Sequence, residues 1–395
     1  MNTRKKCKLL SAIILIFFLL DYIGVFKHIL EISYINFNYP YDGNIQPLVL
    51  DLRQNKKSDV HAINEYNYPY IKISNKCMEA ESLRIVFLVK SAMENFNQRT
   101  AIRNSWGFEK RFFDVPMKVV FILGVHLGDS QIQHQVNTES AEFQDIIQAD
   151  FIDSYYNNTI KTMMAFKWAV DYCSNSKFYM FVDDDYYVSV KNVLRFIRNP
   201  TQYPQYLKDT TNLKNPRKVA KKDSRNLHFN QKEIISDIKS ANVHLQSIRN
   251  NVEASRFKRE ILDFDLPDDI RLFAGFVFLS SPHRHKFSKW YVSLEEYPYD
   301  LWPPYVTAGS YILSKEALMD MYYGSMYTKH FRFDDIYLGL IAKKLDIEPF
   351  HCDEFHFYKK KYLKNNYEFV ISSHGYSDPN ELVKVWGEQK AMGNA

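Results

Sequence analysis

Short apolar runs alternate with stretches of helical periodicity from about residue 82 to residue 200. The apolar runs are bounded by turn residues, are typical of buried strands, and lie at 83–89, 118–124 and 178–182. Between them, apolar residues recur at helical spacing at 97–106, 131–143 and 159–173. A further strand-like run follows at 272–278. This alternation predicts an α/β fold with a mostly parallel sheet covered by helices on both faces, and such sheets bind ligands at the carboxyl ends of their strands.

The N-terminus combines a basic cluster with an apolar run. Four basic residues among the first eight precede residues 9–20, which are almost entirely apolar, and a less pure apolar stretch continues to Phe26. A membrane-spanning helix needs about 20 apolar residues, and basic residues ahead of it favour a cytosolic N-terminus. A cleaved signal peptide is the alternative, but no small-residue cleavage site follows the run. We therefore expect a cytosolic tail at 1–8, a signal-anchor transmembrane helix at 9–30 and a type II topology.

The remainder of the chain divides into a spacer and one folded domain. Residues 31–81 are rich in Tyr, Asn and Pro without a sustained period, so we expect a stem there. The folded domain is expected at 82–390. A charged stretch at about 207–269 interrupts it and is interpreted as a solvated insertion, with a helix near 231–249. The basic run 256–259 resembles a processing site of the secretory pathway, although an exposed charged surface is the commoner explanation.

The composition of the 395-residue chain narrows the classes of protein. With 46% hydrophobic and 25% charged residues it is typical of a globular protein, which excludes a wholly disordered chain and a multi-span transporter. Only 12 glycines are present, and neither a P-loop nor a dinucleotide-binding glycine motif occurs. The formal net charge of +5 comes mostly from the N-terminal basic cluster, so the charge gives no indication of nucleic-acid binding.

Four cysteines and one glycosylation sequon bear on the cellular compartment. Cys7 would face the cytosol in a type II protein, whereas Cys77, Cys173 and Cys352 would lie in the lumen. Three cysteines allow one disulfide and one free thiol, and the sequence leaves the pairing open. Asn157 begins the only N-x-S/T sequon, which matters only in a secretory protein.

Three adjacent aspartates, Asp183, Asp184 and Asp185, directly follow the apolar run at 178–182. Because alternate residues of a strand point the same way, Asp183 and Asp185 can converge while Asp184 turns aside. A divalent cation such as Mn²⁺ or Mg²⁺ offsets the repulsion between such carboxylates and keeps coordination positions for phosphate oxygens. The sequence therefore predicts a metal that bridges to a nucleotide diphosphate. An exposed acidic turn is the alternative, and the preceding buried strand makes it the less favoured one.

A second acidic pair, Asp334 and Asp335, begins a predicted helix that extends to Leu345. On local evidence the ordinary explanation is favourable interaction of the acids with the helix N-terminus. The functional hypothesis is that one carboxylate acts as a general base and takes a proton from a sugar hydroxyl.

A proline-rich segment between the two acidic motifs contains candidate sugar-binding residues. Prolines fix a loop around Trp302 and Tyr305, whose rings have the shape to stack on a sugar, and Gly309 permits close approach of a backbone or ligand. Packing of the two aromatic rings in the core is an equally good explanation. His374 follows a strand-like run at 369–371, and a satisfied structural histidine is the ordinary interpretation.

Together these segments resemble the inverting β-1,3-glycosyltransferases of glycosyltransferase family 31. Seven motifs occur in the order of that family, at 99–107, 121–124, 145–162, 183–185, 302–309, 334–339 and 370–374. The resemblance covers residue 82 to about residue 386 apart from the insertion. Within the family, the stretches 289–298 and 331–335 are most similar to the Brainiac subgroup.

The resemblance implies a fold of the GT-A type, which is a Rossmann-like glycosyltransferase domain, behind the single N-terminal transmembrane helix. It places Asp183 and Asp185, together with Asp184, at the site of a Mn²⁺ or Mg²⁺ ion and the diphosphate of a UDP-sugar. It also assigns Arg99 and Arg103 of the first motif to donor binding.

The same resemblance implies roles for the later motifs. His374 is implied to be a metal ligand, and Asp335 is implied to be the catalytic base, with Asp334 as the second candidate. The acceptor site is implied to contain Trp302, Tyr305 and Gly309. Asn157 remains the expected glycosylation site.

The activity implied is inverting, metal-dependent transfer of a sugar from a UDP-sugar to a 3-hydroxyl, by a single-pass type II protein of the Golgi membrane. GlcNAc is the favoured sugar and Gal the next, and the Brainiac subgroup implies the β-mannose of a glycosphingolipid core as the acceptor. Alternatives are a β-1,3-galactosyl- or GalNAc-transferase acting on glycoprotein or glycolipid, a catalytically silent luminal sugar-binding protein, and a metal-dependent hydrolase that uses the aspartate triplet.

Overall fold

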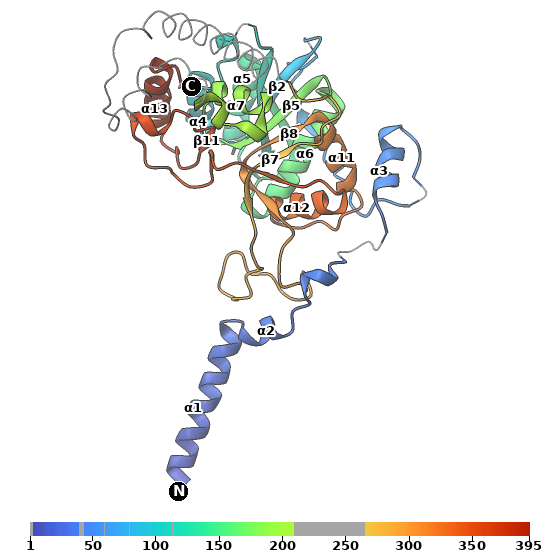
Figure 1. Cartoon of the computed structure of the whole chain (residues 1–395), viewed down its shortest axis with the longest axis vertical. Helices are drawn as coiled ribbons and strands as arrows, with labels where there is room; N and C mark the ends of the chain where they lie inside the picture. Colours follow the sequence, from blue (N-terminus) through green and yellow to red (C-terminus); the bar gives the residue numbers. More distant parts are fainter. Residues whose placement is uncertain (1–2, 39–42, 59, 79, 113, 209–264) are drawn as a thin grey trace, which may run out of the picture.

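The computed structural model describes residues 3–38, 43–58, 60–78, 80–112, 114–208 and 265–395 (Figure 1). The charged insertion expected at 207–269 falls almost wholly outside the described residues, and so do the expected helix near 231–249 and the basic run at 256–259. Figure 1 shows a body built on one large sheet, from which an N-terminal helix projects.

Within the described residues, eight strands form one mixed sheet in the order β1-β4-β3-β2-β5-β8-β7-β9. In that order the strands are β1 (Tyr70–Lys72), β4 (Ile146–Ile152), β3 (Met117–Val125), β2 (Leu83–Lys90), β5 (Ser176–Asp183), β8 (Tyr305–Ser314), β7 (Phe273–Phe278) and β9 (Phe350–His351). Strands β4, β3, β2 and β5 are parallel, whereas β8 is antiparallel to both β5 and β7. The predicted strands correspond to β2, β3, β5 and β7, and the mixed, mostly parallel sheet is confirmed.

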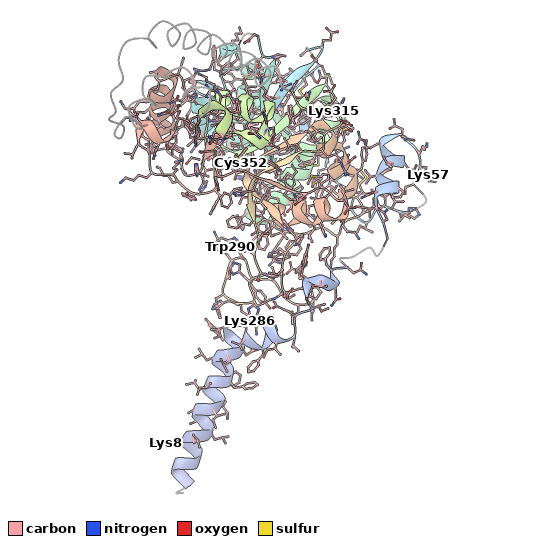
Figure 2. The ribbon with its side chains drawn as sticks, in the orientation of Figure 1. Lys8, Lys57, Lys286, Trp290, Lys315 and Cys352 are labelled. Carbon is pink, nitrogen blue, oxygen red and sulfur yellow. A yellow bond between two sulfur atoms is a disulfide. The ribbon has the colours of Figure 1, made fainter. Side chains whose placement is uncertain are left out.

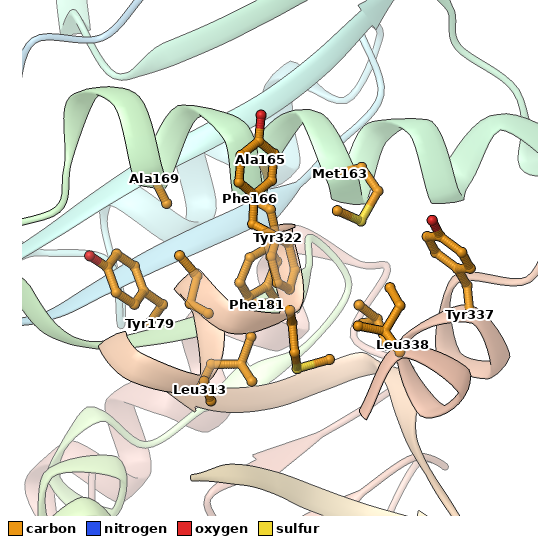
Figure 3. Close-up of a cluster of buried hydrophobic side chains, with 14 of the residues drawn as sticks. Met163, Ala165, Phe166, Ala169, Tyr179, Phe181, Leu313, Tyr322, Tyr337 and Leu338 are labelled. Atoms are coloured by element: carbon orange, nitrogen blue, oxygen red, sulfur yellow. The ribbon is translucent and has the colours of Figure 1, made fainter. Parts of the chain in front are cut away.

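Helices cover both faces of the sheet, because alternate residues of each buried strand point to opposite sides. Val86 and Leu88 of β2 lie in the core under α6 (Asn158–Tyr172), α11 (Lys315–Ser325) and α12 (Asp334–Lys344). The intervening residues of β2 lie in the core under α4 (Phe96–Arg103), α7 (Val190–Arg198) and α13 (Pro379–Ala391). Figure 3 shows the first of these cores, where the rings of Phe166 and Phe181 are 4.7 Å apart. The predicted helices at 97–106, 131–143 and 159–173 correspond to α4, α5 (Ser130–Phe143) and α6.

A small second sheet brings the C-terminal region to the carboxyl end of β5. It consists of β10 (Phe355–His356), β11 (Ser372–Ser373) and β6 (Tyr187–Val188). Strand β11 begins at Ser372, directly after the strand-like run predicted at 369–371. The amide of Tyr376 donates to the carbonyl of Asp185 at 2.7 Å, so the segment after β11 is fixed beside the aspartate triplet.

Part of the expected stem belongs to the folded body. Helix α3 (Gln46–Arg53) packs on α11, and its Val49 is buried. Strand β1 pairs with β4 at the edge of the sheet, and Cys77 forms a disulfide with Cys173. The domain boundary predicted at residue 82 is therefore too late. A three-residue edge strand and a two-turn helix leave too short a hydrophobic period to be recognised in a Tyr- and Pro-rich segment.

The N-terminal residues form α1 (Thr3–Tyr22) and α2 (Val25–Ile29). Among the described residues we find no helix that combines the length and the apolar character needed to cross a membrane. The large apolar side chains from Leu9 to Leu19 on α1 are between 47% and 71% exposed.

The disulfide joins residues 96 positions apart in the sequence, while Cys352 is buried as a free thiol. Closing so long a loop restricts the unfolded chain, so we expect the double variant Cys77→Ser, Cys173→Ser to lose about 2–4 kcal/mol of unfolding free energy. Urea unfolding followed by circular dichroism measures this loss.

The reducing agent supplies the control for this prediction. Reduction of the unaltered chain should give the same loss, and reduction of the double variant should change nothing. Peptide mapping that finds Cys352 in the disulfide would contradict the assignment.

Candidate active site

A cavity of about 600 Å³ lies at the carboxyl end of β5, between β8 and the start of α12. Seven of the residues expected at the functional site line it: Asp183, Trp302, Tyr305, Gly309, Asp334, Asp335 and His374. Residues from both acidic motifs and from the C-terminal motif therefore meet at one place, although Asp185 and Asp334 are 149 positions apart in the sequence. This is the strand end at which an α/β sheet is expected to bind its ligand.

The three adjacent aspartates have three different environments. Asp184 is buried and accepts hydrogen bonds from Ser91 Oγ at 2.6 Å and Asn95 Nδ2 at 2.9 Å. Asp185 pairs with His374, with 3.0 Å between its Oδ2 and Nε2. Asp183 lines the pocket, and burial raises the pKa of its carboxyl to about 6 although a neighbouring ammonium opposes the shift. Asp184 thus turns aside as predicted and lies outside the pocket wall.

Lys90 connects the two acidic motifs. It is the last residue of β2 and is 4% exposed. Its Nζ lies 3.1 Å from Asp183 Oδ1 and 3.0 Å from Asp334 Oδ2, and it donates to the carbonyl of Ala308 at 3.1 Å. Burial alone would lower the pKa of Lys90, but the two carboxylates outweigh it and raise that pKa above its usual value. Lys90 was not among the residues predicted from the sequence, where its one signal is a lysine at the end of a mostly apolar run.

The two carboxylates of the second acidic pair, Asp334 and Asp335, differ in their hydrogen bonds. Asp334 Oδ2 accepts hydrogen bonds from Lys90, from Asn158 Nδ2 at 3.1 Å and from Thr162 Oγ1 at 2.9 Å. Asp335 uses Oδ1 to accept from the amide of Ile336, and no hydrogen bond of its Oδ2 is found among the described residues. Burial and the charge of Asp334 raise the pKa of Asp335 to about 7. A carboxyl with such a pKa is suited to accept a proton near neutral pH, so Asp335 fits a general base better than Asp334.

His374 is held between Asp185 and an aromatic ring. The hydrogen bond to Asp185 raises the pKa of His374 above its usual value. The ring of Tyr186 lies 5.1 Å from that of His374, and a Cβ placed on Gly309 would collide with the Tyr186 hydroxyl. Gly309 is part of strand β8, where the sequence predicted a loop, and its lack of a side chain makes room for Tyr186.

The fit of this site to a divalent cation rests on two side chains. Asp185 offers a carboxylate oxygen and His374 an imidazole nitrogen, both of which Mn²⁺ accepts. Asp183 stands beside them but is paired with Lys90. No group of three or more His, Cys, Asp or Glu side chains placed to hold a metal is found in the described part of the chain. A cation here would therefore need further ligands from a bound diphosphate or water.

Aromatic side chains form the opposite wall of the pocket. Trp302 is 6% exposed and packs on Tyr297, with 4.1 Å between ring centroids, so most of its ring lies in the core. Tyr305 begins β8, stacks on Phe278 and shares a 2.9 Å hydrogen bond with Ser280. The wall also contains aromatic residues that the sequence analysis did not name: Phe278, Trp290 and Phe357.

Arg99 and Arg103 do not line the pocket. Arg99 is fully buried and pairs with Glu139 at 2.7 Å, and Arg103 pairs with Glu139 and with Asp145 at 2.8 Å. Arg99 also donates to Ser91 Oγ, the group that donates to Asp184. This corrects the donor-binding expectation: their guanidinium groups are already paired with carboxylates, and they support the aspartate triplet from behind.

The three residues of the sequon have different environments, and only Asn158 lines the pocket. The side-chain amide of Asn157 donates to the carbonyl of Ile152 at 2.8 Å and is partly exposed. Thr159 is fully buried, and its hydroxyl donates to the carbonyl of Phe331 at 2.8 Å.

An acidic triplet at the end of a central strand, a carboxyl of raised pKa across the pocket and an aromatic wall are the features of a glycosyltransferase. The galactosyltransferase family model matches residues 97–239 and 257–353. The chain belongs to this family, glycosyltransferase family 31, and is most similar there to the Brainiac subgroup. Members are inverting hexosyltransferases.

The names of similar proteins are consistent with membership of this family. β-1,3-Galactosyltransferase brn of Drosophila melanogaster is 38% identical over 395 residues, which covers 99% of this chain and 97% of that protein. β-1,3-Galactosyltransferase 1 of Mus musculus and that of Homo sapiens are each 28% identical over 330 residues, which covers 83% of this chain and 81% of the relative. The solved structure of the galactosyltransferase LgtC with donor and acceptor sugar analogues covers 79% of this chain and 100% of its own, at 10% identity; its TM-score of 0.32 is too low to bear on the fold.

The position of Lys90 generates a prediction. We expect Lys90→Met to lower the unfolding free energy by about 3–5 kcal/mol, because it leaves the buried carboxylate of Asp334 without its charged partner. We expect sugar transfer to fall at least about 100-fold, because the two acidic motifs are no longer held in register. Urea unfolding and a UDP-release assay measure the two effects.

A compensating variant provides the control. Asp334→Asn in the Lys90→Met background removes that unpaired charge and should restore part of the stability without restoring transfer. A Lys90→Met protein that is as stable as the unaltered chain would show that the bridge is dispensable.

Proposed function

We propose that the chain transfers a hexose from a UDP-sugar to the 3-hydroxyl of a glycan acceptor, with Asp335 as the general base. The observation that carries the proposal is the raised pKa of Asp335 in a pocket that it shares with Asp183 and His374. Membership of the β-1,3-galactosyltransferase family supports the same linkage.

The proposed reaction is a single displacement. The acceptor oxygen attacks the anomeric carbon, the bond from that carbon to the β-phosphate oxygen breaks, and the hydroxyl proton passes to Asp335. UDP leaves on the opposite side, so an α-linked donor gives a β-linked product and no enzyme nucleophile is required. Asp334 accepts hydrogen bonds from Lys90, Asn158 and Thr162, and its charge raises the pKa of Asp335, which favours transfer of the hydroxyl proton to Asp335.

A Mn²⁺ or Mg²⁺ ion is part of the proposal. Asp185 and His374 would hold it, with Asp183 beside them, and when bound it would neutralise charge on the departing diphosphate.

Donor, acceptor and location are proposed from the resemblance and the relatives. GlcNAc is the donor sugar we favour from the Brainiac resemblance, and Gal, which the relatives' names contain, is the next. We propose the β-mannose of a glycosphingolipid core as acceptor and the Golgi membrane as location, with residues 9–30 as a type II anchor. The exposed apolar side chains of α1 support membrane attachment.

The base assignment is tested by substitution. We expect Asp335→Asn to lower transfer about 100- to 10,000-fold while UDP still binds, because the amide cannot accept the proton. Transfer is measured with UDP-GlcNAc, UDP-Gal and UDP-GalNAc on β-mannosides and β-galactosides, and binding of UDP by calorimetry. Asp150→Asn, at an exposed aspartate of β4, is the matched control and should leave both unchanged. Normal transfer by Asp335→Asn would refute the assignment.

The raised pKa of Asp335 generates a separate prediction. The base must be ionised to act, so kcat/KM should fall about tenfold per pH unit as the pH drops below about 7, rather than below about 4 as for an ordinary aspartate. A pH–rate profile measures this limb. A rate that remains level down to about pH 5 would contradict the raised pKa.

A further inference from the structure

The segment between β7 and β8, residues 279–304, is tied into a compact loop by one buried arginine. Arg284 is 1% exposed and donates to four carbonyls of the loop, at distances of 2.8 to 3.0 Å: those of Val292, Ser293, Tyr297 and Tyr299. Its remaining contact is an ion pair of 2.6 Å with Glu31, which follows α2. The loop is therefore an ordered structure, and its central residue also holds the N-terminal segment.

Further contacts fasten the N-terminal segment to this loop. The amide of Ile32 donates to the carbonyl of Pro298 at 2.9 Å, and the amide of Asp300 donates to the carbonyl of Ile32 at 3.0 Å. Gly24 has a φ of +85° and lies against Arg284, where any Cβ would clash with the arginine backbone. The direction in which α1 leaves the body is thus set by the loop.

The end of α1 and the tip of the loop expose one apolar and basic surface. The rings of Tyr22 and Phe287 are 4.5 Å apart, and Lys286 Nζ lies 3.7 Å from Asp21. Phe287 is 69% exposed and Trp290 46%. Figure 2 shows Lys286 beside the end of α1 and Trp290 between it and the body. We name this the anchor–loop surface, defined as residues 9–22 with Lys286, Phe287, Lys289 and Trp290.

The same loop forms part of the pocket wall. Trp290, His283 and Trp302 line the cavity that contains Asp335. Phe287 and Trp290 are three positions apart, so their Cα atoms are at most about 11 Å apart. The packing of α3, β1 and Cys77 on the body also removes most of the expected stem as a spacer. The pocket therefore lies close to the apolar helix.

We propose that the loop part of the anchor–loop surface, Lys286 to Trp290, lies on the lipid bilayer that residues 9–22 enter, with Phe287 and Trp290 in contact with lipid and the pocket facing acceptors carried on membrane lipids. The amphipathic ring of Trp290 favours the headgroup level, and Lys286 and Lys289 favour anionic headgroups. Continuity of the exposed apolar helix with the loop identifies lipid as the occupant rather than a second protein. The inference rests on the proposed transferase function and adds the surface through which the pocket reaches a glycolipid acceptor.

The test uses the full chain reconstituted in phosphatidylcholine–phosphatidylserine vesicles. Transfer is compared for one glycan presented either on a lipid in the vesicles or as a soluble glycoside. We expect the variant Lys286→Ser, Phe287→Ser to lower transfer to the lipid-linked acceptor about tenfold and to leave the soluble acceptor unchanged. The matched control is Phe108→Ser, at a phenylalanine that is 51% exposed and outside the anchor–loop surface.

Tryptophan fluorescence gives a measurement that is independent of activity. Of the five tryptophans, four are at most 6% exposed and Trp290 is 46% exposed, so quenching by brominated lipid should report on Trp290. We expect quenching in the unaltered chain and its loss in Trp290→Phe. Equal quenching in both proteins, or equal loss of transfer to the two acceptors in the Lys286→Ser, Phe287→Ser variant, would overturn lipid contact by the loop.

Two further outcomes distinguish lipid contact by the loop from a dimer interface and from failure of the proposed function. A dimer in detergent that the Lys286→Ser, Phe287→Ser variant converts to a monomer would assign the surface to a second copy and overturn the proposal. Loop quenching in a chain that transfers no sugar to any acceptor would support the lipid contact but refute the glycolipid acceptor, together with the proposed function.

Discussion

The ammonium group of Lys90 lies between carboxylates from two distant motifs, and the geometry of the pocket depends on it. The carboxylate of Asp183 at the end of β5 and the buried carboxylate of Asp334 at the start of α12 would repel each other without a cation between them. A single cation at the end of β2 brings both within 3.1 Å of itself. Burial and the neighbouring charge of Asp334 raise the pKa of Asp335, so Asp335 is harder to ionise than an ordinary aspartate. One lysine thus joins the two acidic motifs at the pocket.

A second layer of buried charge holds the aspartate triplet in place. Arg99 connects Glu139 to Ser91, and Ser91 connects to Asp184. This chain leaves Asp183 directed at the pocket and Asp185 at His374. Tyr186 packs between His374 and Gly309, so the histidine, the strand β8 and the triplet are fixed against one another. Side chains that are held by packing and by buried hydrogen bonds reach catalytic geometry without reordering.

The sequence predicted those features that have a local pattern. Strands β2, β3 and β5 are mostly apolar runs, and the rule that ligands lie at strand ends placed Asp183 at the ligand-binding edge of the sheet. Lys90 escaped prediction because one lysine at the end of an apolar run forms no motif, and its two partners are distant in sequence. Arg99 and Arg103 were misassigned because a motif match does not tell whether a guanidinium faces a ligand or a buried carboxylate. The edge strand β1 and the loop at 279–304 are held by contacts to remote residues, which no local period reveals.

The buried threonine of the sequon constrains the order of events during synthesis. A glycosylating enzyme must bind the hydroxyl of Thr159 together with the amide of Asn157, and in the finished fold that hydroxyl is bonded to Phe331, a residue translated 172 positions later. Any oligosaccharide on Asn157 must therefore be attached while the polypeptide is still open, before the segment around Phe331 packs on Thr159. Once attached, it would stand next to Tyr155 and Asn158, where a bulky hydrated chain would screen one side of the cleft entrance.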